Sequence, residues 1–143
     1  MINEIVLWKV GRYAELDKKT IGFINQITKT SRKINIKLTR EILIHLLTTK
    51  GIRLPMASTI LRFKNPKIYQ IIDQRVYRLI TGKELKLSQS KSAKYIEAQI
   101  NLYLEYLEKL RNTCKENNID FKQSDRILYK IDKRVNGQIN IKY

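Results

Sequence analysis

The longest helical pattern in the chain, Ala93–Glu116, is the feature that most constrains the fold. Apolar side chains recur along it at steps of three and four residues, the spacing of one face of an α-helix. They are Ile96, Ile100, Tyr103, Leu107 and Leu110. We therefore expect a long amphipathic helix, with Tyr103 and Tyr106 packed among its leucines.

Shorter helical patterns, separated by turn residues, occupy much of the remaining chain. They run over Ile2–Val10, Lys18–Thr28, Arg40–Thr48, Pro55–Phe63, from Asp73 toward Ile80, and Asp125–Arg134. Asp17, Thr39 and Ser124 are the predicted N-caps, since short oxygen-bearing side chains accept hydrogen bonds at helix starts. Gly51 and Gly82 are the predicted breaks. The sequence predicts an all-α fold of about seven helices in a single domain, residues 1–143.

The chain is strongly basic, with 29 lysines and arginines against 13 aspartates and glutamates and a formal net charge of +16. Such a field attracts polyanions, among which nucleic acid is the most common partner and anionic membrane the second. A soluble domain that simply carries solvated lysines is the alternative.

Cysteine usage and hydropathy exclude several protein classes. The single cysteine, Cys114, excludes an internal disulfide framework and a four-cysteine zinc site. Apolar runs such as Ile42–Leu47 are far shorter than the roughly 20 residues that cross a bilayer. We also find no secretory signal pattern, no Walker loop and no zinc-protease motif. We expect an intracellular, cytoplasmic protein, without a membrane partner, a bound metal or a small-molecule cofactor.

The most informative stretch, about residues 39–82, has the layout of a helix-hairpin-helix. A helix, a Gly51 turn, a second helix with small residues, an extended link and an Asp73 helix start follow one another. A hairpin of this kind offers backbone N–H groups to one phosphate without reading sequence. Lys50 and Arg53 flank the turn and could add ionic phosphate contacts.

Asp73 lies sixteen positions after Ala57, within the sequence Ile-Asp-Gln-Arg-Val-Tyr-Arg. With the hairpin, this spacing resembles the HhH-GPD superfamily of DNA glycosylases, the endonuclease III-like and 8-oxoguanine glycosylase-like enzymes. Their hairpin typically reads LPGVGxxTA, and an Asp in a VDTHVxR-like sequence follows its Ala by about sixteen residues. The resemblance covers about residues 40–82 and includes Ile72, Val76 and Arg78.

The resemblance implies a DNA-binding protein that hydrolyses an N-glycosidic bond. Asp73 would be the catalytic carboxylate, which stabilises positive charge on the sugar or helps to activate the nucleophile. Lys50, Gly51, Ile52, Arg53 and Arg75 would contact the phosphates of duplex DNA, and Arg78 would form a structural ion pair. Pro55 stands where bifunctional members carry a lysine, so a monofunctional enzyme without β-lyase activity is expected. Arg53 stands in place of the second hairpin glycine.

Each of these residues also has a simpler interpretation. Asp73 at a helix start is a common N-cap. His45, inside an apolar helix, is more simply a packed histidine, and Trp8 a core residue. Two other function classes therefore stay open, a non-catalytic DNA-binding module and a protein-interaction domain. The sequence leaves the oligomeric state open.

Overall fold

The computed structural model describes residues 16–88 and 90–136. Every regular element within these residues is a helix, and no strand occurs among them. In order, the elements are α2 (Lys18–Ile24), α3 (Ile36–Thr48), α4 (Leu54–Lys64), α5 (Gln74–Thr81), α6 (Ala93–Glu116), the 3-10 turn η1 (Phe121–Gln123) and α7 (Ser124–Asn136). The all-α prediction is confirmed. The helix predicted at Ile2–Val10, which includes Trp8, lies outside the described residues.

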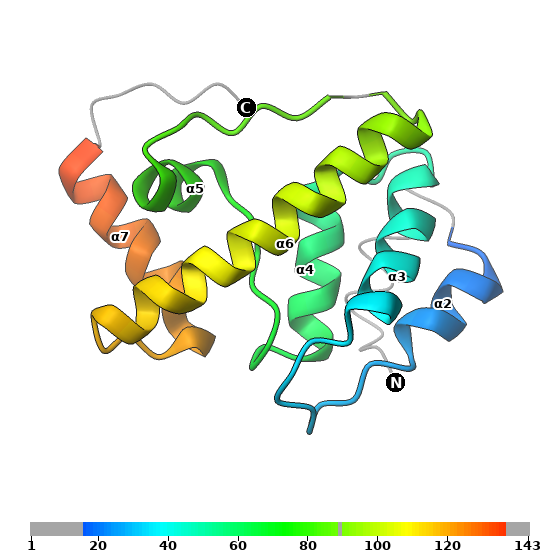
Figure 1. Cartoon of the computed structure of the whole chain (residues 1–143), viewed down its shortest axis with the longest axis horizontal. Coiled ribbons are helices and arrows are strands. Elements are labelled where there is room, and N and C mark those ends of the chain that lie inside the picture. Colours follow the sequence, from blue (N-terminus) through cyan, green and yellow to red (C-terminus); the bar gives the residue numbers. More distant parts are fainter. Residues whose placement is uncertain (1–15, 89, 137–143) are drawn as a thin grey trace.

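Helix α6 runs diagonally across the molecule and joins its two ends (Figure 1). It contacts α3 on one side and α5 and η1 on the other. Helix α3 also packs against α2 and α4, while α5 packs against α7. The predicted apolar face of α6 is buried along its whole length, through Ile96, Ile100, Tyr103, Leu107 and Leu110. Full burial of each aliphatic side chain contributes about 1.5–3 kcal/mol, so this face organises the core.

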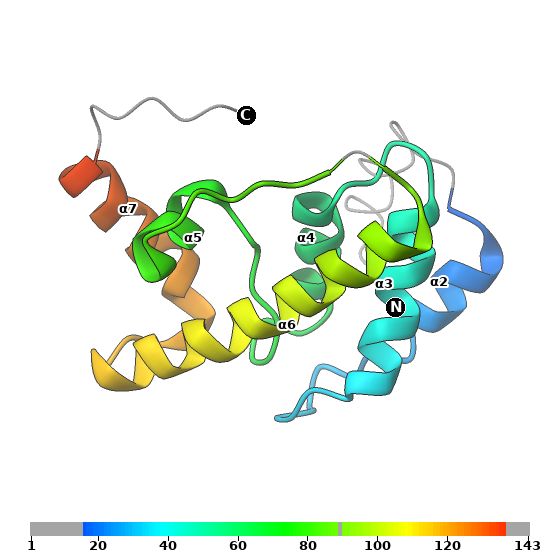
Figure 2. The same ribbon diagram turned by 45° about the horizontal axis from the view of Figure 1, so that its top comes forward.

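Two connections outside the helices position the site described below. The first, residues 65–73, leads from the end of α4 to the start of α5 (Figure 2); it begins with a turn at residues 66–68, and we call it the extended link. The second, residues 83–88 and 90–92, runs from α5 to α6 past the α3–α4 turn; we call it the strap. The sequence predicted both as non-helical segments.

Helix α3 begins earlier than the sequence predicted, and its N-cap is Asn35 rather than Thr39. The Asn35 Oδ1 atom accepts the Leu38 N–H at 3.1 Å. Thr39 lies inside the first turn, where its hydroxyl donates to the Asn35 carbonyl at 2.8 Å and contacts the Tyr69 hydroxyl. Because asparagine caps a helix at least as well as threonine, the earlier start is stable.

The start of α7 also differs from the prediction that Ser124 is its N-cap. The 3-10 turn η1 leads directly into α7, and Ser124 already has helical backbone angles, φ −60° and ψ −39°. Its hydroxyl donates to the Phe121 carbonyl at 2.8 Å instead of accepting an N–H. The capping oxygen belongs to Asp120, which accepts the Lys122 N–H at 3.2 Å.

Candidate nucleic-acid interface

The turn between α3 and α4 is tight and has a positive backbone angle at Gly51. Gly51 has φ +88°, a conformation that glycine adopts without a steric cost. Arg53, in contrast, has φ −108° and ψ 170°, an extended conformation open to any residue. The turn therefore needs one glycine, and Arg53 occupies the second position without backbone strain.

The four candidate residues of the turn divide into three surface residues and one core residue. Lys50, Gly51 and Arg53 are exposed, whereas Ile52 is 0% exposed. The Ile52 N–H donates to the Thr49 carbonyl at 3.2 Å. Because this donor already has a partner, Ile52 supports the turn from inside, and only its three neighbours present exposed groups at the surface.

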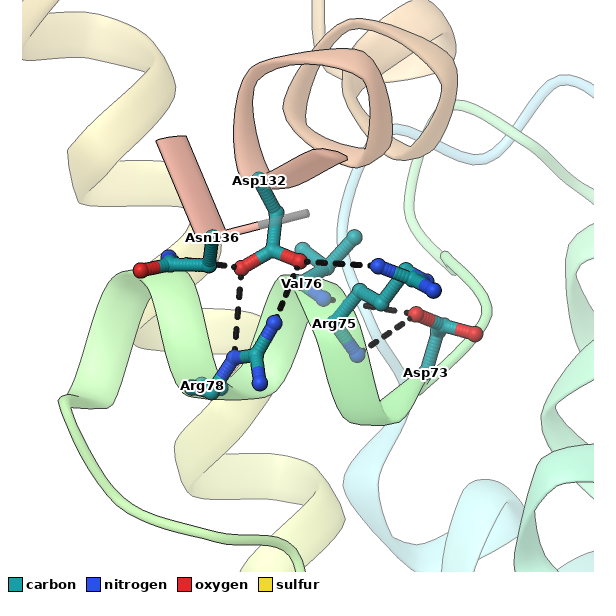
Figure 3. A network of polar contacts seen from close by, with 6 residues as sticks. All are labelled: Asp73, Arg75, Val76, Arg78, Asp132 and Asn136. Carbon is teal, nitrogen blue, oxygen red and sulfur yellow. Dashed lines mark hydrogen bonds and ion pairs between the residues drawn. The ribbon is translucent and has the colours of Figure 1, made fainter. Parts of the chain in front are cut away.

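Arg75, predicted as a phosphate contact, lies in an ion-pair network between α5 and α7 (Figure 3). Its Nη1 atom is 3.5 Å from Asp132 Oδ2, and its guanidinium lies over the Tyr129 ring at 5.4 Å. Arg78 Nη2 is 2.8 Å from the same carboxylate oxygen, which confirms the ion pair expected for Arg78. The Arg75 guanidinium is thus paired with Asp132, while its predicted phosphate contact stays a prediction.

Asp132 is the buried centre of this network and was missed by sequence reasoning. Its side chain is 0% exposed and also accepts a hydrogen bond from Asn136 at 3.0 Å. Burial alone would raise the pKa of the Asp132 carboxyl, but the hydrogen bonds from Arg78 and Asn136 and the charge of Arg78 outweigh it. The pKa therefore lies below its ordinary value. The available signal was an Asp in the middle of a helix, facing the same side as Leu128.

Asp73 is the N-cap of α5, as its simpler interpretation predicts. Its Oδ1 atom accepts the N–H groups of Arg75 at 2.8 Å and Val76 at 3.3 Å. The second carboxylate oxygen points away from the start of the helix (Figure 3). The side chain is partly exposed. One oxygen thus fixes the helix start while the other faces outward.

The extended link before Asp73 is held by side chains from α4 and α6. The Ser58 hydroxyl accepts the Ile72 N–H at 3.1 Å. The hydroxyls of Tyr103 and Tyr106 donate to the carbonyls of Gln70 at 2.8 Å and Ile71 at 3.1 Å. These buried bonds satisfy backbone groups that have no helix to pair them, so the position of Asp73 is set by two other helices.

The α3–α4 turn and Asp73 line the same cavity, which has a volume of about 710 Å³. Gly51 and Arg53 form one part of its wall, and Asp73 forms another. Apolar walls come from Pro55, Met56, Ile71, Ile72, Leu85 and Leu87. The hairpin and the carboxylate that the sequence singled out are therefore brought together at one opening.

The strap supplies charged residues to this cavity that sequence reasoning did not identify. Lys86 adds a second cation beside Arg53, and Glu84 adds a second carboxylate beside Asp73. Both are exposed. Hydrophobic periodicity could not identify Lys86 and Glu84 as cavity residues. The sequence of a polar loop does not show which part of the fold the loop passes.

The other candidate groups have ordinary packing roles. The His45 ring stacks on Phe23, with ring centres 4.9 Å apart, and Cys114 is buried. Among residues 16–88 and 90–136, no three His, Cys, Asp or Glu side chains gather in a way that could hold a metal ion. None of the described helices combines the length and hydropathy needed to cross a bilayer.

Comparisons with protein-family models, with curated proteins and with solved structures found no match for this chain. The glycosylase resemblance therefore rests on the residues of about 40–82 alone.

Proposed function

We propose that this protein binds DNA through its phosphate backbone at the α3–α4 turn and acts as a monofunctional base-excision glycosylase. The observation that carries the proposal is the shared cavity, in which the exposed turn cation Arg53 and the carboxylate Asp73 line one opening. The net charge of +16 supplies the long-range attraction that a polyanionic partner requires.

The cavity suits a nucleotide that has left the base stack. Its volume of about 710 Å³ lies within the range of roughly 300–1,000 Å³ that is usual for small-molecule sites. Met56, Leu85 and Leu87 offer apolar surface to a base, while Arg53 and Lys86 offer charge to its phosphates. A glycosylase needs such a space, because its target base must be extruded from the duplex before the bond is reached.

The proposed chemistry is electrostatic. As the base leaves, the sugar gains positive charge, and a fixed carboxylate beside it lowers the energy of that transition state. Asp73 is held by its cap to Arg75 and Val76 and by the pinned link behind it, so it needs no rearrangement to face the cavity. Pro55 at the start of α4 has no amine, which agrees with hydrolysis rather than Schiff-base chemistry.

Base release by the wild type and by Asp73→Asn tests the catalytic part. Asparagine caps a helix as well as aspartate does, so the variant should fold normally while losing the charge. On a panel of damaged duplexes we expect the wild type to release bases and the variant to be about 10²–10³-fold slower, with unchanged DNA affinity. No base release by folded wild-type protein on a broad panel would exclude the enzymatic function.

A non-catalytic DNA-binding module is the second candidate, because both capping bonds account for Asp73 without any chemistry. Binding to duplex DNA across a salt series tests this part separately. We expect Lys50→Gln and Arg53→Gln each to reduce the magnitude of the salt slope by about 1. Lys115→Gln, which changes an exposed lysine in the last turn of α6, is the charge-matched control and should keep the slope of the wild type. No affinity for DNA near 50 mM salt would instead favour a protein-interaction domain.

A further inference from the structure

A second cavity, of about 290 Å³, lies between the α3–α4 turn and the strap. Gly51, Ile52 and Arg53 line it from the turn, and Ser88, Ser90 and Lys91 line it from the strap. Leu47, Ile96 and Gln99 complete the described wall. This wall has two cations, two hydroxyls and one amide, and it contains no carboxylate among the described residues.

The two cations connect the turn to the strap in opposite directions. Lys91 Nζ, on the strap, donates to the Ile52 carbonyl of the turn at 2.6 Å. Arg53 Nη2, on the turn, reaches the Leu87 carbonyl of the strap at 3.5 Å, a distance at which a hydrogen bond is weak. A lysine has three donors and an arginine five, so these contacts use only part of their capacity.

The positive charges of Arg53 and Lys91 meet at this cavity, whose described lining contains no acid. No ion pair within residues 16–88 and 90–136 includes either side chain. Burial lowers the pKa of Lys91, and the nearby charge of Arg53 lowers it further. An anion bound between the two cations would relieve this repulsion, whereas a neutral ligand would leave it.

The geometry points to a phosphate group as the ligand of this cavity, held by Arg53 and Lys91. A phosphate has oxygens enough to accept from both cations and from the hydroxyl of Ser88, while the Ser90 hydroxyl already donates to Ser92 at 3.2 Å. The cavity is close to the lower limit of small-molecule sites, roughly 300 Å³, so it fits a phosphate with an attached sugar rather than a longer chain.

This phosphate site deepens the proposed function and rests on it for the origin of the phosphate. Gly51 and Arg53 line both cavities, so the two openings meet at the turn. A strand could place one phosphate between Arg53 and Lys91 and the neighbouring nucleoside beside Asp73. Lys91 then takes over phosphate contact at the turn from the Ile52 N–H, which already donates to Thr49.

Inorganic phosphate is the direct probe, titrated into the full chain and followed by calorimetry at low salt. We expect saturable binding by the wild type and about tenfold weaker binding by Lys91→Gln, which corresponds to about 1.4 kcal/mol. Lys94→Gln is the matched control, because Lys94 is exposed one turn further along and does not line the cavity. Equal affinity in Lys91→Gln and Lys94→Gln would overturn the proposal.

Because Lys91 also holds the strap to the turn, a second variant must leave that bond intact. Ser88→Asp adds a negative charge to the wall. The Ser88 hydroxyl accepts the Ser90 N–H at 3.1 Å, and an aspartate can make the same local turn. We expect at least tenfold weaker phosphate binding with an unchanged melting temperature. Phosphate binding as tight as that of the wild type in this variant would contradict the site even if Lys91→Gln failed to fold.

Oligonucleotides distinguish the source of the phosphate and separate this inference from the proposed function. If Lys91→Gln weakens binding to DNA without terminal phosphates, the ligand is a phosphodiester; if only inorganic phosphate or a terminal phosphate responds, it is a monoester. Either result supports the site, and the absence of both overturns it. None of these measurements depends on base release. The phosphate site can therefore be supported even if the protein has no glycosylase activity, and glycosylase activity can be found even if the phosphate site is absent.

Discussion

At the scale of single residues, the two oxygens of Asp73 have different surroundings. Oδ1 accepts two helix N–H groups, while the other oxygen points away from them (Figure 3). Asp73 also lines the cavity of about 710 Å³. A single side chain can therefore cap a helix and line a cavity. Stability and activity measured on the same variants can tell the two roles apart.

Substitution of Asp73 should affect stability according to capping ability rather than charge. We expect Asp73→Ala to lower the free energy of unfolding by about 1 kcal/mol and Asp73→Asn to leave it within about 0.5 kcal/mol. Urea denaturation followed by far-ultraviolet circular dichroism measures both. Glu84→Gln, which removes a carboxylate from the same cavity, is the control and should be neutral. Equal losses for the alanine and asparagine variants would contradict the capping role.

Asp132 should carry a pH-dependent share of the stability. Its pKa is lower in the folded protein than the ordinary value of about 3.9, so the carboxylate stabilises the fold fully above that pH. The contribution is lost as the pH falls through the lower, folded pKa. We expect Asp132→Asn to cost about 3 kcal/mol at pH 7, because it leaves Arg75 and Arg78 facing a neutral group at a buried site.

The measurement for Asp132 compares urea midpoints of the wild type and Asp132→Asn from pH 7 to pH 3. The difference between the two proteins should shrink below about pH 4. A difference that stays constant over this range would show that the ion-pair network does not set the acid stability. The neighbouring pair Arg62–Asp125, at 3.8 Å and partly exposed, offers Asp125→Asn as a control with a small effect.

The sequence predicted the chemistry of single residues better than their partners. Asp73 caps a helix start and Arg78 forms an ion pair, as expected. Ile52 and Arg75 do not fit the expected contacts, because their partners, Thr49 and Asp132, are set by the turn and by a helix more than fifty positions away. Local pattern carries no information on such a long-range pair.

At the scale of elements, Gly82 and Gly22 have opposite roles in their helices. Gly82 ends α5 with φ +70°, while Gly22 lies exposed inside α2. An added Cβ would meet no atom within 4 Å at either position, so backbone conformation alone decides the outcome. This makes the pair a clean comparison of one substitution in two contexts.

Alanine should destabilise the protein at Gly82 and stabilise it at Gly22. We expect Gly82→Ala to lower the free energy of unfolding by about 1 kcal/mol, since a Cβ disfavours the left-handed conformation. Gly22→Ala should raise it by roughly 0.5–1 kcal/mol through helix propensity. Thermal and urea unfolding measure both. A change of the same sign at both glycines would contradict this account.

Element types were predictable from periodicity, whereas their starts were less so. All the helices predicted within the described residues occur, yet α3 and α7 start differently from their predicted caps. Asn35 competes with Thr39, and a 3-10 turn precedes Ser124. Several residues in each segment could cap a helix, and the choice depends on tertiary contacts such as that of Thr39 with Tyr69.

At the scale of the whole molecule, α6 packs against both of two helix groups, α2, α3 and α4 at one end and α5 and α7 at the other. The Arg62–Asp125 ion pair adds a direct link between α4 and α7. Helix α6 contacts α3 at one end and α5 and η1 toward the other. Because its buried face is continuous, loss of packing in α6 should weaken both groups at once. The site depends on this, since α3 and α4 supply the turn and α5 supplies Asp73.

Unfolding should therefore be a single cooperative transition. We expect Leu107→Ala to lower the free energy of unfolding by about 3 kcal/mol, as for a large-to-small change in a packed core. Hydrogen exchange of the protected amides in α3 and α7 should accelerate by a common factor. Asn112→Ala, on the exposed face of α6, is the control. Accelerated exchange confined to α7 would show that the two groups unfold independently.

The shared cavity was only partly foreseeable from the sequence. The spacing of Ala57 and Asp73 indicated that the turn and the carboxylate belong together, and both line the cavity of about 710 Å³. The sequence predicted the strap as a loop, but only the structure shows that it brings Lys86 and Lys91 to the turn. Its polar residues have no periodicity, and only the three-dimensional path of residues 83–88 and 90–92 brings them to the turn.

The tyrosines that pin the extended link also give the protein a built-in optical reporter. Burial and neighbouring groups raise the pKa of Tyr103 and of Tyr106 well above the ordinary phenol value. Both rings therefore resist phenolate formation while their hydroxyls donate to the carbonyls of Gln70 and Ile71. In an alkaline titration, these two rings should therefore contribute phenolate absorbance only after the extended link has detached from them. Once exposed, they should ionise with the unfolded tyrosine pKa of about 10.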